Sequence, residues 1–134
     1  GRYPPDGSRK PTRAPIKNEW QNGLKNDRGT ISMARTAVAD SGTSQFFINV
    51  YPNPPLDQHN HGAAYAVFGK AVTGLKTIDT IHGQPAMGER PTTPVKVESA
   101  KRISADDAKK LIDEEKQAAA KKPVPPSTTA PNQP

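Results

Sequence analysis

The residues best suited to chemistry lie in one short stretch, Ser44 to Val50, where amide and aromatic side chains alternate. Successive side chains of an extended chain point to opposite sides, so Gln45, Phe47 and Asn49 share one face. A large aromatic between two amides could hold an apolar group and hydrogen-bond a peptide backbone, as a shallow binding site requires. A half-buried strand with one exposed aromatic would explain the same pattern, so the neighbouring segments have to decide.

Other chemical motifs are scarce. Asp57, His59 and His61 form a metal-like cluster, but without a third firm ligand we expect ordinary loop residues. The chain has no cysteine, which excludes disulfides, thiolate metal sites and cysteine nucleophiles. It also lacks a nucleophile elbow, a phosphate loop and a dinucleotide fingerprint. We therefore expect no metal and no organic cofactor.

The composition indicates that only part of the 134 residues folds. Hydrophobic residues make up 32%, aromatic residues 5%, and there are 15 prolines, which is thin for a core spread over the whole length. No apolar run approaches the length of a membrane span, so a membrane partner is not expected. The first residue is not methionine, which suggests a fragment or a processed product. A chain without cysteine suits a reducing or an oxidising compartment, so the composition fits a cytoplasmic as well as a periplasmic or secreted location.

The net charge of +6 is concentrated near the start of the chain. Residues 1–35 hold eight basic and three acidic side chains, a balance of +5. These charges are dispersed among prolines and glycines, so a solvated basic loop is favoured over a nucleic-acid surface.

Short strands are expected to position the candidate side chains. Alternating patterns predict strands over residues 30–34, 44–50, 64–68 and 95–97, with residue 103 as the outer limit of the last one. Within 44–50, the side chains of Phe46, Ile48 and Val50 are expected to form the core face.

A helix and a loop complete this part of the chain. Apolar residues near helical spacing predict a short helix between Thr73, as its cap, and Gly83, just past its end. The prolines between 52 and 55 cannot donate to a strand ladder, so they predict a loop anchored by Leu56.

The sequence changes character after residue 103. Ser104 can cap a helix with Asp107 three residues on, and that charged helix would span 104–122. The proline-rich segment 123–134 has nothing to bury and is expected to be a disordered tail. The predicted organisation is a folded domain at 1–103, a helix at 104–122 and a tail at 123–134.

Four segments occur in a characteristic order and spacing: Gly29–Arg35, Thr43–Asn49, Leu56–Asp57 and Tyr65–Lys70. Together they resemble the cyclophilin family of peptidyl-prolyl cis-trans isomerases. The arm at residues 10–19 looks like that of the bacterial-type members. The resemblance runs from about residue 1 to residue 103.

This resemblance implies a mainly β fold, a closed antiparallel β-barrel with a binding groove on its outer face, which would be incomplete here without its first strands. Phe47 would form the wall of a proline pocket with Leu56 beside it. Gln45 and the backbone of Arg35 would hold the substrate peptide. The implied substrate-binding residues are Ala34, Arg35, Gln45, Phe47, Leu56 and Tyr65.

The sequence departs from the family pattern at two positions of the site and in one whole segment. Tyr65 falls where many eukaryotic-type members have histidine and bacterial-type members often have tyrosine. Pro55 stands where the family usually has an aromatic. The segment that carries the family's catalytic arginine has no match, since none of Arg2, Arg9 or Arg13 corresponds to it.

Two functions remain open on this basis. The first is a peptidyl-prolyl cis-trans isomerase that assists protein folding, and the second is a catalytically impaired module that binds proline peptides. The implied partners are proline-containing peptides or unfolded proteins, and cyclosporin-like ligands.

Overall fold

The structure is a computed structural model that describes residues 8, 10–58, 62–88, 90–101 and 103–120. The chain divides into two compact units, Gly1–Lys101 and Arg102–Pro134. The predicted tail at 123–134 lies outside the described residues.

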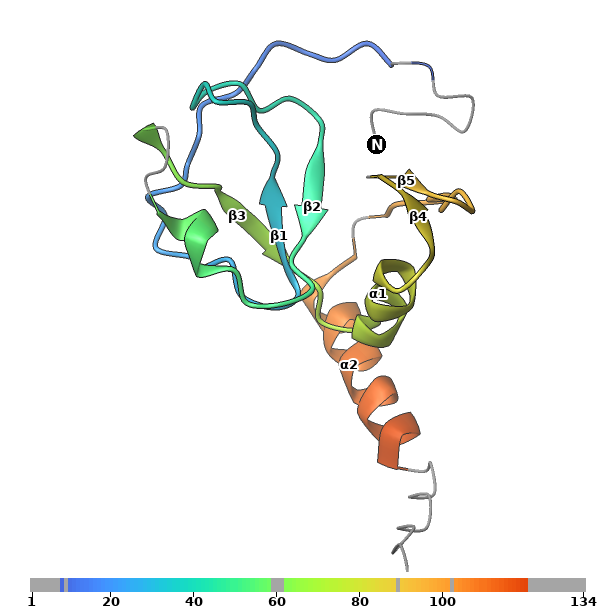
Figure 1. Cartoon of the computed structure of the whole chain (residues 1–134). Helices are drawn as coiled ribbons and strands as arrows, with labels where there is room; N and C mark the ends of the chain where they lie inside the picture. The colour runs from blue at the N-terminus through green and yellow to red at the C-terminus, as the bar shows by residue number, and fades with distance from the viewer. Residues whose placement is uncertain (1–7, 9, 59–61, 89, 102, 121–134) are drawn as a thin grey trace, which may run out of the picture. The chain divides into compact units, whose positions relative to one another are not determined.

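A three-stranded antiparallel sheet forms the centre of the first unit (Figure 1). Its strands are β1 (Thr30–Met33), β2 (Phe46–Ile48) and β3 (Val67–Lys70), in the order β2-β1-β3. The register places Ile31 opposite Ile48 and Met33 opposite Phe46. Three of the four predicted strands thus have counterparts in this antiparallel sheet, whereas the described residues form no closed barrel.

The sequence predicted that Phe46 lies on the buried face of this sheet and Asn49 on the exposed face, and the structure shows the reverse for both residues. On the apolar face, Phe46 is 51% exposed and packs edge-on against Phe68 at 6.5 Å between ring centres. On the other face, Ser32 and Asn49 are buried, with 0% and 4% exposure. The expectation that Phe46 lies in the core is therefore wrong for this chain, since the described segments leave that ring half open to solvent.

Two predicted strands have different bounds in the structure. The segment expected at 64–68 becomes a strand only from Val67, because the Tyr65 amide donates to the Leu56 carbonyl instead of a ladder partner. The strand expected at 95–97 is absent, and Val97 is 72% exposed. Strands persist where a neighbouring edge satisfies their backbone groups. The additional pair β4 (Ala86–Met87) and β5 (Arg90–Pro91) has such an edge.

The helix α1 (Leu75–His82) lies within the range predicted for it. Gly74 precedes it in the left-handed region, with φ of 73°, so Thr73 is not its cap as expected. At the other end the amide of Gly83 donates to the Asp79 carbonyl at 2.9 Å, as the glycine predicted.

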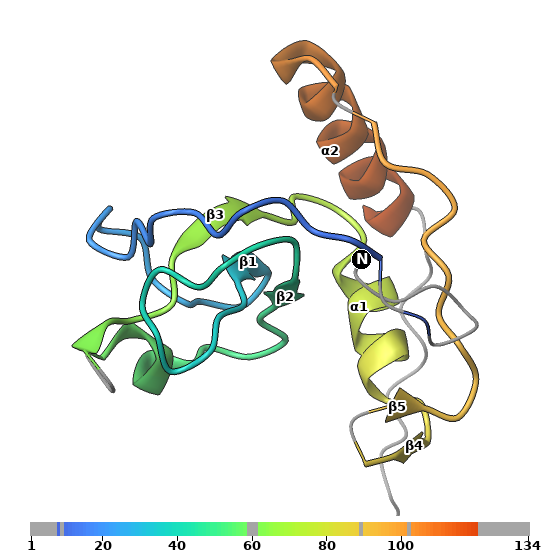
Figure 2. The ribbon, with the colours of Figure 1, turned by 90° about the horizontal axis from the view of Figure 1, so that it is seen from above.

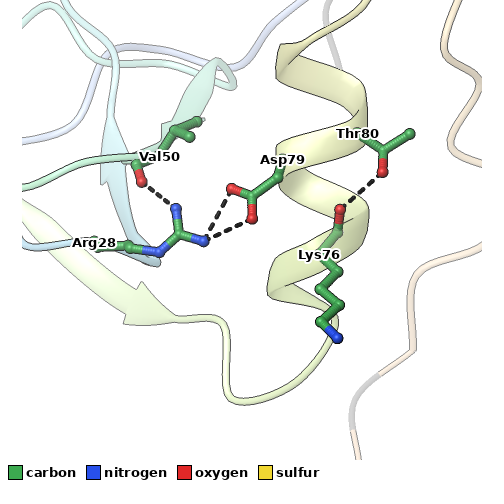
Figure 3. Close-up of polar contacts among 5 residues, drawn as sticks. All are labelled: Arg28, Val50, Lys76, Asp79 and Thr80. Atoms are coloured by element: carbon green, nitrogen blue, oxygen red, sulfur yellow. Dashed lines mark hydrogen bonds and ion pairs between the residues drawn. The ribbon is translucent and has the colours of Figure 1, made fainter. Parts of the chain in front are cut away.

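One arginine joins α1 to the sheet (Figure 3). The Arg28 guanidinium donates to the Val50 carbonyl and to both carboxylate oxygens of Asp79 at 2.9 Å. Both side chains of this ion pair are more than a third exposed, so it contributes only about 0.5–1 kcal/mol. The link fixes one turn of α1 beside the end of β2.

The polar arm before β1, drawn in blue in Figure 2, is hydrogen-bonded to the chain that enters β3. Its side-chain amides donate to backbone carbonyls, from Asn18 to Ala64 at 3.0 Å and from Asn22 to Val67 at 2.8 Å. Because these carbonyls belong to the segment that enters β3, the arm holds that segment in place.

The second unit contains the helix α2 (Ala105–Ala120). The amide of Asp107 donates to the Ser104 hydroxyl at 3.1 Å, and that hydroxyl donates to the Asp107 carboxylate at 2.7 Å. The predicted cap is therefore formed. In the part of the chain that the structure describes, no helix is both long and apolar enough to cross a bilayer.

Candidate functional site

A groove of about 420 Å³ opens where the end of β1 approaches two other segments. One is the 3-10 helix η1 (Pro54–Asp57), and the other is the chain that leads into β3. We call it the Tyr65 groove, and its lining residues are Arg35, Thr36, Ala37, Pro55, Leu56, Gln58, Ala63 and Tyr65. Its volume falls in the range of small-ligand sites.

Three of the predicted site residues line this groove, namely Arg35, Leu56 and Tyr65. Phe47 is not among the lining residues, but it supports Tyr65, because the centres of the two rings lie 5.6 Å apart at an angle of 76°. Such edge-to-face pairs add about 0.5–1.5 kcal/mol beyond the area they bury. Phe47 and Tyr65 thus form one aromatic wall, in which Tyr65 lines the groove and Phe47 contacts Tyr65.

The guanidinium of Arg35 stabilises this wall. It lies 4.7 Å from the centre of the Tyr65 ring, within the range of a cation–π contact. Its N–H groups donate to backbone carbonyls of Ala63, Ala64 at 3.3 Å, and Thr36 at 2.8 Å. The side chain is therefore bound to two of the segments that form the groove.

Ala34 and Gln45 lie at the end of the β1–β2 pair, outside the lining of the groove. The Ala34 amide donates to the Gln45 carbonyl at 3.0 Å. This bond extends the strand pairing beyond Met33 and fixes the start of the segment that carries Phe47. The substrate-binding role expected of Ala34 and Gln45 stays a prediction, as it does for the four residues at the groove.

Asn49, which the sequence placed on the same face as Phe47, is not available to a ligand. It is 4% exposed, and its amide nitrogen donates to Thr30 Oγ1 at 2.9 Å and to Asn26 Oδ1 at 3.1 Å. The polar side chains of β1 cover this end of the face. Asn49 is therefore part of a buried network and does not line the site.

Sequence reasoning missed several residues of the groove and one that hydrogen-bonds to Tyr65. Pro55 was recognised only as a departure, and the four others that line the groove gave no signal beyond their adjacency to Arg35, Leu56 and Tyr65. Asn26, which connects the network around Asn49 to Asp57, also gave none.

Of the metal-like cluster noted in the sequence, only Asp57 lies among the described residues. Asp57 accepts hydrogen bonds from the backbone and side chain of Asn26, whereas His59 and His61 lie outside the described residues. Within 10–58 and the other described ranges, no three metal-ligating side chains gather.

Comparison with known proteins matches residues 2–102 to a family described as cyclophilin type peptidyl-prolyl cis-trans isomerase/CLD. The peptidyl-prolyl cis-trans isomerase A of Dickeya dadantii is 46% identical over 108 residues, 77% of this chain and 57% of that protein. A peptidyl-prolyl cis-trans isomerase of Acinetobacter baylyi is 49% identical over 105 residues, 75% of this chain and 56% of that protein. The chain thus spans little more than half the length of these two relatives.

Proposed function

The chain belongs to the cyclophilin-type peptidyl-prolyl cis-trans isomerase family, and on that premise we propose that the Tyr65 groove binds Xaa-Pro segments and accelerates their cis-trans isomerisation. The substrates would be proline-containing peptides and unfolded proteins. Cyclosporin-like ligands would occupy the same groove.

The observation that carries this proposal is the aromatic wall next to the apolar residues of the groove. Phe47 and Tyr65 stand edge to face, and Leu56 and Pro55 line the groove beside Tyr65. A prolyl ring is apolar and rigid, so it fits between such surfaces with little loss of conformational freedom.

Isomerisation requires more than binding. Rotation about the amide bond is opposed by about 18–20 kcal/mol, and the protein must favour the twisted amide over both planar forms. The groove would hold the ring and exclude water from the amide while the strand end at Ala34 and Gln45 anchors the rest of the peptide. The rotating and fixed parts of the substrate would then be held by different segments.

The second candidate function is a binding module with impaired catalysis. It is favoured by Pro55, which lines the groove at the position where the family usually has an aromatic residue. A positioned donor toward the prolyl nitrogen stabilises the twisted state, and losing such a donor costs about a hundredfold in rate or more. Binding of Xaa-Pro peptides would survive this loss.

Exchange between cis and trans forms of an Ala-Pro peptide distinguishes the two functions. With the chain present, we expect NMR signals of Leu56 and Tyr65 to shift on adding this peptide but not an Ala-Ala peptide, and exchange cross-peaks of the peptide to grow. Shifts without faster exchange would establish the binding module instead. If the peptide caused no shifts and its exchange were not faster, both functions would be excluded.

We also propose that the three strands are part of a closed barrel completed by residues that the relatives possess beyond the matched region. The half-exposed rings of Phe46 and Phe68 on the apolar face support this, as do the two sheet edges at β2 and β3. Exposed apolar faces and open edges are unfavourable in water and favour pairing.

Co-expression tests this part of the proposal. The chain is produced with the part of the Dickeya dadantii isomerase that it does not match, and the two are purified through a tag on one of them. We expect a stable complex and a loss of the fluorescence of an apolar dye that binds the chain alone. If the two parts do not co-purify and dye binding is unchanged, the barrel is not completed in this way.

A further inference from the structure

One buried side chain connects the Tyr65 groove to the centre of the sheet. Asn26 is 1% exposed and, with Ser32, is the largest fully buried side chain among the described residues. A buried amide is costly unless its donors and acceptors are satisfied. Its partners therefore reveal what it holds together.

On the side of the groove, Asn26 contacts two separate segments. Its Nδ2 donates to Asp57 Oδ1 at 2.8 Å and to the Tyr65 carbonyl at 3.2 Å. Its backbone amide donates to the same Asp57 oxygen at 2.9 Å. Asp57 follows Leu56 in η1, and the Tyr65 amide donates to the Leu56 carbonyl at 3.0 Å. Asn26 thus closes a ring of contacts between the two segments that carry Leu56 and Tyr65.

On the side of the sheet, the orientation of the Asn26 amide is determined by two donors. Its Oδ1 accepts from the Ser32 hydroxyl at 2.6 Å and from Asn49 Nδ2 at 3.1 Å. Because the oxygen must face these donors, Nδ2 must face Asp57 and Tyr65. The Asn26 carbonyl also accepts from the amide of Asn53, just before η1, at 2.8 Å. Both ends of η1 are therefore bound to this one residue.

We propose that Asn26 is a positioning residue that sets the spacing of Leu56 and Tyr65 in the groove and thereby its affinity for Xaa-Pro peptides. The statement about affinity rests on the proposed function. The statement about spacing does not, because it follows from the contacts of Asn26 alone.

The substitution Asn26→Asp tests this role with almost no change in volume. It removes the Nδ2 donor and places a second carboxylate against Asp57. We expect hydrogen exchange of the Tyr65 amide to accelerate by about tenfold or more, because its bond to the Leu56 carbonyl opens more often. Peptide affinity, measured by NMR titration, should fall by about fivefold to tenfold.

The double variant Asn26→Asp with Asp57→Asn provides a rescue. The new amide at position 57 can donate to the new carboxylate at position 26, which removes the repulsion and rejoins η1 to the sheet. We expect protection of the Tyr65 amide and peptide affinity to recover in part, since the bond to the Tyr65 carbonyl stays lost. Urea denaturation of the same variants separates this local recovery from a change in overall stability.

The control is Arg28→Gln, which breaks the link to α1 and touches no residue of the groove. It should lower overall stability while leaving peptide affinity unchanged at temperatures where the chain is folded. If Asn26→Asp weakens peptide binding no more than this control and leaves exchange of the Tyr65 amide unchanged, Asn26 does not position the groove.

The proposal can still be tested if Asn26→Asp does not fold or if the unaltered chain does not bind the peptide. Should Asn26→Asp fail to fold, Asp57→Ala removes only the partner in η1 and must still accelerate exchange at Tyr65, or the proposal fails. Should the unaltered chain bind no Xaa-Pro peptide, the proposed function is wrong, and exchange of the Tyr65 amide still decides the role of Asn26.

Discussion

Phe47→Ala is expected to weaken binding of an Ala-Pro peptide by about tenfold or more, which corresponds to about 1.4 kcal/mol. The ring of Phe47 packs edge to face against the ring of Tyr65, and the Tyr65 ring makes a cation–π contact with the Arg35 guanidinium. Removing the first ring deletes part of the apolar wall and leaves the second free to change rotamer. NMR titration of the labelled chain with the peptide measures the affinity.

The matched control lies one residue earlier on the same strand. Phe46 points to the opposite face, where it is half exposed and contacts Phe68. Phe46→Ala removes the same number of atoms and should leave peptide affinity unchanged. Normal binding by Phe47→Ala, or equal losses in both variants, would show that the peptide does not bind at the Tyr65 groove.

Asn49→Ala is expected to lower the free energy of unfolding by about 2–3 kcal/mol, a large share of the stability of a small domain. The side chain donates to Asn26, Thr30 and, at 3.4 Å, Ser32, all within the buried polar network. Its removal leaves the hydroxyl oxygens of Thr30 and Ser32 without this donor in a region closed to bulk water. Urea denaturation followed by circular dichroism measures the loss.

Asn22→Ala is the comparison, because Asn22 is an exposed amide with partners of similar geometry. It donates to the Val67 carbonyl at 2.8 Å and accepts from the Leu24 amide at 3.0 Å. Water can replace these partners, so the expected loss is about 1 kcal/mol or less. Similar losses for both variants would contradict the account of Asn49 as a member of a buried network.

Much of the local structure could be predicted from the sequence. The alternation in Ser44–Val50 predicted a strand with two unlike faces, and β2 forms at its centre. Ser104 predicted the start of α2, and the Asp107 amide donates to its hydroxyl. The prolines before Leu56 predicted a break in strand pairing, which η1 provides. These features depend on the conformational preferences of a few neighbouring residues, so a short stretch of sequence contains the necessary information.

The composition of the groove could be predicted only in part. The resemblance to a family indicated Arg35, Leu56 and Tyr65, which the structure brings to one groove, and Phe47, which supports it. It did not indicate Thr36, Ala37, Gln58 or Ala63, which also line the groove. Those residues become neighbours only when the segments before β3 and after β1 approach each other, and no local pattern encodes that approach.

The sequence by itself determined which side chains share a face of β2, because alternation is a property of any extended chain. Only the tertiary structure decided which face is buried. The apolar pattern predicted that Phe46 would be inside, yet Phe46 is 51% exposed while Asn49 is 4% exposed. The physical reason is that burial depends on which other segments cover a face. Asn26 and the polar side chains of β1 cover the end that holds Asn49 and satisfy its amide, whereas the described segments leave the ring of Phe46 half exposed.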